Sequence, residues 1–184
     1  LVVTFGGLTA ENYYYQNTEV WKHPILSKFV PPTLLRASSV RRIMAPEDEF
    51  RDDDAAAAAK QLLDRGINVN IGAHGQREGL GSHWEIWSFA RGGFSPMEAL
   101  STATINPARY LKMDADLGSI EKKKLADLLI LNANPLENIR NTDKISHIMA
   151  NGRLYEAKSL KEVHTGESEL KPFYWQGNPE SEIF

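Results

Sequence analysis

The residues best suited to chemistry lie in one glycine-spaced stretch between Gly72 and Glu85. His74 follows the alternating apolar and polar run at residues 67–71, which predicts a short strand. A histidine just past the carboxyl end of a strand lies where α/β proteins place catalytic groups. Because imidazole titrates near neutral pH and binds divalent metals, His74 and His83 are candidate acid–base groups or metal ligands, and Glu85 is a candidate partner.

The glycines of this stretch are open to two interpretations. Gly75, Gly79 and Gly81, with Gln76 among them, allow a backbone to approach a ligand closely. Equally, they only shape a tight loop in which the histidines bond to backbone carbonyls. No spacing here matches a complete zinc site such as His-Glu-x-x-His, and the sequence has neither a Gly-x-Ser-x-Gly elbow nor a Walker-type phosphate loop.

Composition excludes several classes of partner. The chain has 184 residues, and its 21 basic residues are nearly balanced by 24 acidic ones, without a dense basic block. Nucleic acid is therefore not expected as a partner, because binding the phosphate backbone requires a concentrated positive face. No apolar run is long enough to predict a membrane span. The absence of cysteine excludes disulfides and thiolate ligands but leaves the compartment unassigned.

The order of the predicted helices and strands that must position these residues is typical of an α/β protein. A helix is predicted before the strand. It would begin with the acidic residues Asp52–Asp54, continue through five alanines and end at Gly66. Further helices are predicted at residues 83–91 and, from a capping box with proline at the first helical position, at residues 96–104. Residues 9–30, which are rich in aromatics but without clear period, predict a long loop with one short helix at most.

The pattern changes after residue 113. Asn151 and Gly152 separate the apolar runs 145–150 and 153–156, and Asn-Gly in this setting is the strongest short signal for a hairpin with a type I′ turn. A small β unit is therefore expected at residues 114–157.

Several longer runs resemble a known family. They are similar to the C-terminal signature of the metal-dependent amidohydrolase superfamily, and within it to the imidazolonepropionase-like branch. The runs that carry the resemblance are residues 72–76, 79–85, 97–111, 116–121, 124–131 and 148–155.

The resemblance implies a fold. Residues 1–113 would form the C-terminal part of a (β/α)8 TIM-type barrel, with residues 67–71 as its eighth strand. Residues 114–157 would supply the C-terminal share of a small β-sandwich subdomain, followed by a tail at residues 158–184. Because a complete barrel takes about 250 residues, and because the chain opens inside a predicted strand without an initiator methionine, we expect a fragment of a larger protein.

The resemblance also implies an activity, namely hydrolysis of a C–N bond in a cyclic or peptide-like amide of a small-molecule substrate. In this family, water is activated by one or two divalent metals, usually zinc. His74 is the tentative ligand and acid–base group of this chain, and the other ligands would lie upstream of Leu1. His83, Glu85, Gln76 and Gly75 would line the pocket or support the residues that do.

Two departures from the family pattern leave an alternative open. The chain contains no His-x-His pair, and the position where the family has Gly-Thr-Asp is occupied by Gly72, Ala73 and His74. An imidazole brings no negative charge to a metal. The alternative is a non-catalytic binding or structural module that keeps the barrel without its metal chemistry. Either way the chain alone is expected to be inactive, and to associate with itself or with the missing N-terminal part of the barrel.

Overall fold

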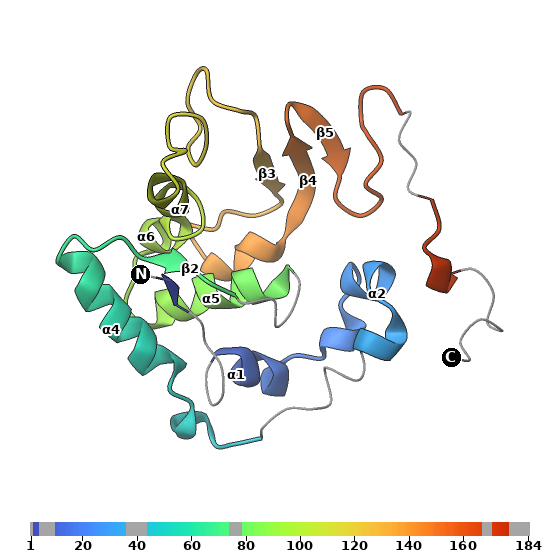
Figure 1. Ribbon diagram of the computed structural model, residues 1–184. Helices are drawn as coiled ribbons and strands as arrows, with labels where there is room; N and C mark the ends of the chain where they lie inside the picture. Colours follow the sequence, from blue (N-terminus) through green and yellow to red (C-terminus); the bar gives the residue numbers. More distant parts are fainter. Residues whose placement is uncertain (1, 4–9, 36–43, 74–78, 167–170, 177–184) are drawn as a thin grey trace.

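The structure is a computed structural model that describes residues 2–3, 10–35, 44–73, 79–166 and 171–176. It is a mixed α/β arrangement of short helices with two small sheets (Figure 1). The α-helices are α1 (Ala10–Asn17), α2 (Leu26–Phe29), α4 (Asp52–Asp64), α5 (Leu80–Arg91), α6 (Pro96–Ser101) and α7 (Ile105–Tyr110), and residues 32–35 are also helical. The 3-10 helices are η1 (Val20–Lys22), η2 (Glu47–Glu49), η3 (Ile139–Asp143) and η4 (Tyr174–Gln176). The strands are β1 (Val2–Val3), β2 (Asn70–Ile71), β3 (Leu128–Leu131), β4 (Ile145–Ala150) and β5 (Arg153–Glu156).

Strand β2 is bonded along both edges. On one edge it pairs in parallel with β1, and the paired residues are Val2 with Asn70 and Val3 with Ile71. On the other edge the N–H of Ile71 donates to the carbonyl of Thr102 at 3.0 Å, and Nδ2 of Asn106 donates to the carbonyl of Val69 at 3.0 Å. The segment that carries α6 and α7 therefore occupies this edge at these positions. The strand is shorter than the predicted run of residues 67–71 because its described partner is only two residues long.

Helix α4 packs against α5 at very short range. Gly92 ends α5, and a Cβ atom built on it would lie 2.3 Å from Cβ of Ala56 and 2.5 Å from its carbonyl carbon. Glycine at this position is what lets the two helices approach. The predicted helix at Asp52–Asp64 is confirmed, whereas α5 begins at Leu80 rather than at residue 83. Glycines at its start, Gly79 and Gly81, concealed the first turn from the sequence pattern.

The core lies between α1 and α5 and is aromatic. Tyr14 is only 2% exposed. Its ring stacks on Trp84 with a centroid distance of 5.6 Å and meets Trp87 edge-on at 5.4 Å. Tyr15 meets Trp84 edge-on at 5.0 Å. Aromatic pairs in this geometry contribute about 0.5–1.5 kcal/mol beyond their buried area.

The prediction of a long loop at residues 9–30 is therefore wrong, because this segment contains α1, η1 and α2. Its helical period was hidden by three consecutive tyrosines. Tyr14 and Tyr15 enter the core, and Tyr13 is also covered, by an edge-on contact with Phe50 at 5.6 Å. Apolar contacts on adjacent positions blur the 3.6-residue repeat on which a sequence prediction depends.

Helix α6 begins as its capping box predicts. Oγ of Ser95 accepts the N–H of Glu98 at 3.3 Å, and the Glu98 carboxylate accepts the N–H of Ser95 at 2.8 Å. Pro96 occupies the first turn, where no N–H is needed. The helix ends at Ser101, three residues before the predicted end at residue 104.

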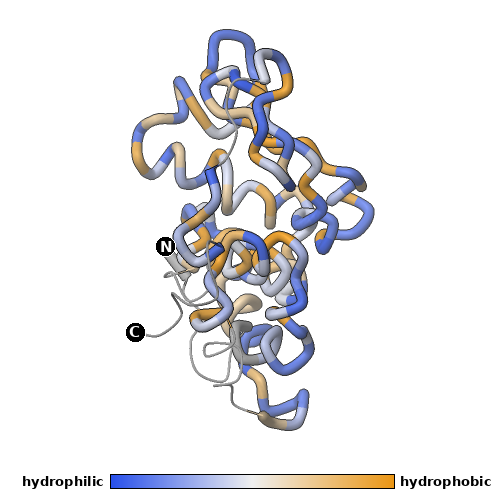
Figure 2. Tube along the Cα trace, turned by 90° about the vertical axis from the view of Figure 1, so that its right-hand side faces the viewer, coloured by the Kyte–Doolittle hydropathy of each residue, from blue (hydrophilic) through white to orange (hydrophobic). Residues whose placement is uncertain are grey.

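Strands β3, β4 and β5 form an antiparallel sheet in that order. The turn between β4 and β5 has positive φ at both Asn151 (48°) and Gly152 (78°), which is the type I′ conformation that Asn-Gly predicts. None of the strand residues in this sheet is fully buried. Figure 2 shows the sheet region as a lobe at the top of the helical part, with hydrophobic residues spread through both.

Across the described ranges, no helix has the length and apolar character needed to cross a membrane.

Candidate functional site

The chain leaves β2 through Gly72 and Ala73, and helix α5 lies against this exit (Figure 1). Glu85 of α5 is only 4% exposed, and its Oε2 accepts the backbone N–H of Gly72 at 2.5 Å. A buried carboxylate is tolerated only where it is hydrogen-bonded, and a bond to a charged acceptor is roughly twice as strong as a neutral one. Glu85 therefore fixes the backbone just before His74.

The first turn of α5 also touches this exit. A Cβ atom on Gly81 would lie 3.4 Å from Cβ of Ala73 and 3.8 Å from its carbonyl oxygen. A methyl group at position 81 would thus be in van der Waals contact with Ala73. The first turn of α5 therefore lies beside the exit of β2, and the buried carboxylate of Glu85 bonds to it.

His83 takes part in a different contact, between α5 and the β unit. Its Nδ1 lies 3.1 Å from Oγ1 of Thr142 in η3, and the same hydroxyl accepts Nε1–H of Trp87 at 2.8 Å. The Thr142 hydroxyl therefore links the side chains of His83 and Trp87 on α5 to η3. Thr142 is 4% exposed, so the shared hydroxyl is buried.

Burial lowers the pKa of His83 below its ordinary value. Asp143 opposes this shift by attraction, and His23 adds to it by repulsion. The surroundings of His83 therefore favour its neutral form near neutral pH.

The structure does not bring the two described candidates on α5 together. His83 and Glu85 are two residues apart, which places them about 200° apart around an α-helix. In agreement, Glu85 bonds to the exit of β2 whereas His83 bonds to η3. The other candidates, His74, Gly75 and Gln76, lie outside the described residues.

The described part of the chain contains no group of three or more His, Asp or Glu side chains placed to hold a metal ion. His83 and Glu85 are engaged with Thr142 and Gly72 and face different elements. The described residues on their own therefore do not fit a divalent metal.

Sequence reasoning missed a buried ionic network at the other end of α5. The Asp52 carboxylate, fully buried at the start of α4, accepts bonds from Ser88 at 3.1 Å and from Arg91 at 2.8 Å. Burial raises the pKa of Asp52, and attraction to Arg91 opposes that shift. From the sequence alone, Asp52 is accounted for as an acidic residue in the first turn of a helix. Its partner Arg91 lies 39 residues away, so no local sequence pattern could reveal the pair.

Comparison with known proteins gives three consistent findings. The sequence profile of the amidohydrolase family matches residues 18–155. The imidazolonepropionase of Symbiobacterium thermophilum is 54% identical over 39 residues, which are 21% of this chain and 9% of that protein. The 5-methylthioadenosine/S-adenosylhomocysteine deaminase of Thermoanaerobacter pseudethanolicus is 30% identical over 109 residues, which are 53% of this chain and 25% of that protein.

A solved structure agrees with the sequence matches. A Xaa-Pro dipeptidase with bound methionine in its active site superposes with a TM-score of 0.51 at 25% identity, over 67% of this chain and 32% of the other. The chain thus spans a quarter or less of the two curated relatives and about a third of this solved chain.

Proposed function

We propose, because this chain belongs to the amidohydrolase family, that it is part of a hydrolase that cleaves a carbon–nitrogen bond in a small-molecule substrate. The observation that carries the proposal is the family match over residues 18–155, which includes β2, α5, β3, β4 and all but the last residue of β5. The deaminase and the dipeptidase among its relatives both break such bonds. A cyclic amide or a peptide-like amide is the substrate class we propose for this chain.

Within this proposal, the reaction takes place at the carboxyl end of β2. His74 follows this exit directly in sequence, and we assign it the role of acid–base group or metal ligand, with Gly75 and Gln76 beside the substrate. Support comes from Glu85, whose buried carboxylate holds Gly72 two residues before His74. Holding the preceding backbone restricts where an imidazole at position 74 can reach, and such preorganisation is the main contribution of supporting residues to catalysis.

We assign Glu85 and His83 different supporting roles. Glu85 positions the strand exit, whereas His83, through Thr142, joins helix α5 to the β unit. Of the two roles expected for His83, lining the pocket or supporting residues that do, we propose the supporting one, in which it orients α5.

The proposed enzyme extends beyond this chain. Residues 1–113 would supply late strands and helices of a (β/α)8 barrel, residues 114–157 a share of a β-sandwich, and residues 158–184 a tail. Amidohydrolases generally use divalent metals, and we propose zinc here, held by His74 and by ligands that this chain does not contain. When bound, the metal would make water nucleophilic at neutral pH.

Metal analysis of the full-length protein that contains this chain tests the proposal. We expect a bound divalent metal, loss of amide hydrolysis after chelation, and recovery on adding zinc. The assay would use dipeptides with a carboxyl-terminal proline and N-acyl amino acids as substrates. Hydrolysis would be measured as release of the free amine. A protein that contains no metal, hydrolyses none of these substrates and is unaffected by a chelator would support a binding or structural module instead.

A further inference from the structure

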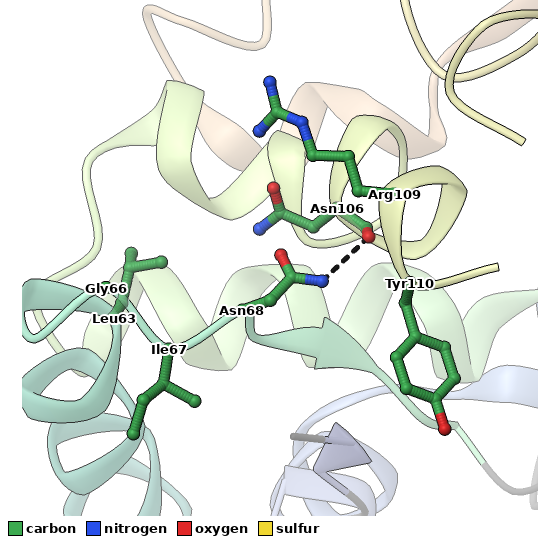
Figure 3. Close-up of a pocket in the computed structure, with 7 residues that line it drawn as sticks. All are labelled: Leu63, Gly66, Ile67, Asn68, Asn106, Arg109 and Tyr110. Atoms are coloured by element: carbon green, nitrogen blue, oxygen red, sulfur yellow. Dashed lines mark hydrogen bonds between the residues drawn. The ribbon is translucent and has the colours of Figure 1, made fainter. Parts of the chain in front are cut away.

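A cavity opens at the other end of β2 from Glu85. It has a volume of about 460 Å³ and is lined by residues from the end of α4, the entry to β2 and α7 (Figure 3). The lining residues are Leu63, Gly66, Ile67, Asn68, Asn106, Arg109 and Tyr110. The cavity is not lined by Gly72, Ala73 or Glu85, which form the exit of β2 and its support. An occupant of the cavity would therefore not fill the candidate active site.

The apolar part of this cavity is accessible. Helix α4 ends at Asp64, and the chain reverses at Gly66, where φ is +80°, before entering the strand. Ile67, which follows this reversal, is 44% exposed, and Tyr110, at the end of α7, is 66% exposed. Both line the cavity together with Leu63. Covering a water-exposed hydrophobic surface with an apolar group lowers the free energy, so this surface favours binding of such a group.

The amide groups of the cavity are held in place. Nδ2 of Asn68 donates to the backbone carbonyl of Asn106 at 2.9 Å and to Oδ1 of Asn70 at 3.3 Å. Nδ2 of Asn106 donates to the carbonyl of Val69 at 3.0 Å. These bonds tie the cavity wall to the backbone of β2 and α7, so the wall is formed before any ligand arrives, which reduces the entropy lost on binding.

Arg109 gives the cavity a positive charge. It stands in the last turn of α7, and none of the seven lining residues is acidic. In the part of the chain that the structure describes, no carboxylate lies within salt-bridge distance of its guanidinium. In Figure 3 the side chain of Arg109 lies beyond Asn106 and Asn68, and its guanidinium points away from Ile67, which lies with Leu63 on the side of α4. The side chain of Arg109 is exposed, so a rotamer change can turn this cation toward the apolar surface.

We propose that this cavity is a second binding site, which takes a small carboxylate that bears an apolar group. The guanidinium of Arg109 would bind the carboxylate through two parallel hydrogen bonds, a geometry that arginine provides and lysine does not. Leu63 and Ile67, on the side of α4, would cover the apolar group. The cavity volume lies within the range of about 300–1,000 Å³ that small-molecule sites occupy. The inference stands on the cavity alone and does not depend on the proposed hydrolase activity.

Titration of the isotope-labelled full-length protein that contains this chain with benzoate tests this site. We expect the side-chain signals of Arg109, Asn68 and Asn106 to shift together and to saturate. Benzamide has the same ring and no charge. Its affinity should be lower than that of benzoate by about tenfold or more, because a hydrogen bond to a charged group contributes about 1.5–3 kcal/mol. Acetate, which has the charge and no ring, should also bind more weakly.

Two variants separate the site from general attraction of anions. Arg109→Gln should weaken benzoate binding about tenfold or more, and Arg109→Lys should restore only part of it. Arg65→Gln is the matched control, because Arg65 is an exposed arginine at the end of α4 that does not line the cavity, and it should leave binding unchanged. Equal effects of the Arg109 and Arg65 variants, or equal affinities for benzoate and benzamide, would overturn the proposal.

Discussion

The guanidinium of Arg91, in the last turn of α5, lies 2.8 Å from the carboxylate of Asp52, whose side chain is fully buried at the start of α4. Arg91 also covers the ring of Tyr13, with its guanidinium carbon 4.1 Å from the ring centre. One residue thus neutralises a buried charge and closes the edge of the aromatic core. The pair joins two helices that the sequence separates by the whole of β2 and its exit.

Removing the cation should therefore destabilise the protein. We expect Arg91→Gln to lower the free energy of unfolding by about 2–4 kcal/mol, because it leaves a buried carboxylate without its partner. Arg51→Gln is the control, since Arg51 pairs with Asp54 at the surface, where both side chains are 69% exposed. That change should cost about 0.5 kcal/mol or less. Urea unfolding followed by tryptophan fluorescence measures both, and equal losses would contradict the role assigned to Arg91.

The penalty of Arg91→Gln should also depend on pH. Because burial raises the pKa of Asp52, the folded protein keeps a proton on this carboxyl at a higher pH than the unfolded chain does. This group therefore favours folding increasingly as pH falls from above its raised folded-state pKa to its ordinary value of about 4. In the variant the neutral carboxyl no longer needs a cation, so the loss of stability should be smaller at pH 4 than at pH 7. An unchanged loss across this range would argue against a buried charge as the cause.

A second pH dependence has the opposite sign and arises at His83. Burial lowers the pKa of His83, so the unfolded chain binds a proton at a higher pH than the folded protein does. The stabilising contribution is complete above the ordinary histidine pKa of about 6.5 and is lost as pH falls through the lowered folded-state value.

We expect His83→Gln to reduce this loss of stability between pH 7.5 and pH 5. His23, whose pKa burial also lowers, should account for part of what remains. His164→Gln changes an exposed histidine and should leave the pH profile of the urea midpoint as it is in the parent chain. Coincident profiles for the parent and His83→Gln would exclude His83 as a source of acid sensitivity.

The parts of this fold that could be predicted from the sequence are those whose determinants are local. Ser95 and Glu98 are three residues apart and fix the start of α6, and Asn151 with Gly152 fixes the hairpin between β4 and β5. In each case the residues that make the contact are also the residues that give the signal. The helix at Asp52–Asp64 belongs to the same class, because acid, alanine and glycine act through the helix itself.

The contacts of the candidate site are not local. Glu85 and Gly72 are 13 residues apart, and His83 and Thr142 are 59 residues apart. Sequence reasoning selected Glu85 and His83 by residue type and placed them in one group, but it could not tell which face of α5 each one occupies. That depended on where the helix begins, and glycines at its start obscured this. The roles of His74, Gly75 and Gln76 remain predictions.

Gly118 illustrates how a glycine in the family signature acts through packing. Its φ is +89°, and a Cβ atom there would lie 2.8 Å from Cβ of Ala108 and 2.9 Å from Cα of Ile105. Gly152 also has positive φ, at +78°, but nothing lies within 4 Å of such an atom. A Gly→Ala change at either position meets the same backbone strain, so the difference between the two isolates the contact with α7.

We expect Gly118→Ala to lower the free energy of unfolding by about 1–3 kcal/mol more than Gly152→Ala does, because overpacking against backbone atoms forces α7 to move. Hydrogen exchange at the amides of α7 should rise in the first variant and not in the second. Equal destabilisation by both changes would mean that strain alone explains Gly118.

The contact between Glu85 and Gly72 can be tested without a substrate, because it makes a local prediction about one amide. In Glu85→Ala the N–H of Gly72 loses its acceptor, so we expect hydrogen exchange at Gly72 to accelerate and the free energy of unfolding to fall by about 1–3 kcal/mol. Glu85→Gln keeps an oxygen in the same place but removes its charge, and a neutral acceptor is roughly half as strong. It should therefore give an intermediate rate at Gly72. Glu121→Gln alters a carboxylate that is 63% exposed and should change neither quantity. If Gly72 exchanges equally fast in all three variants and the parent chain, the carboxylate of Glu85 does not hold the exit of β2, and its assigned role as the residue that positions His74 fails with it.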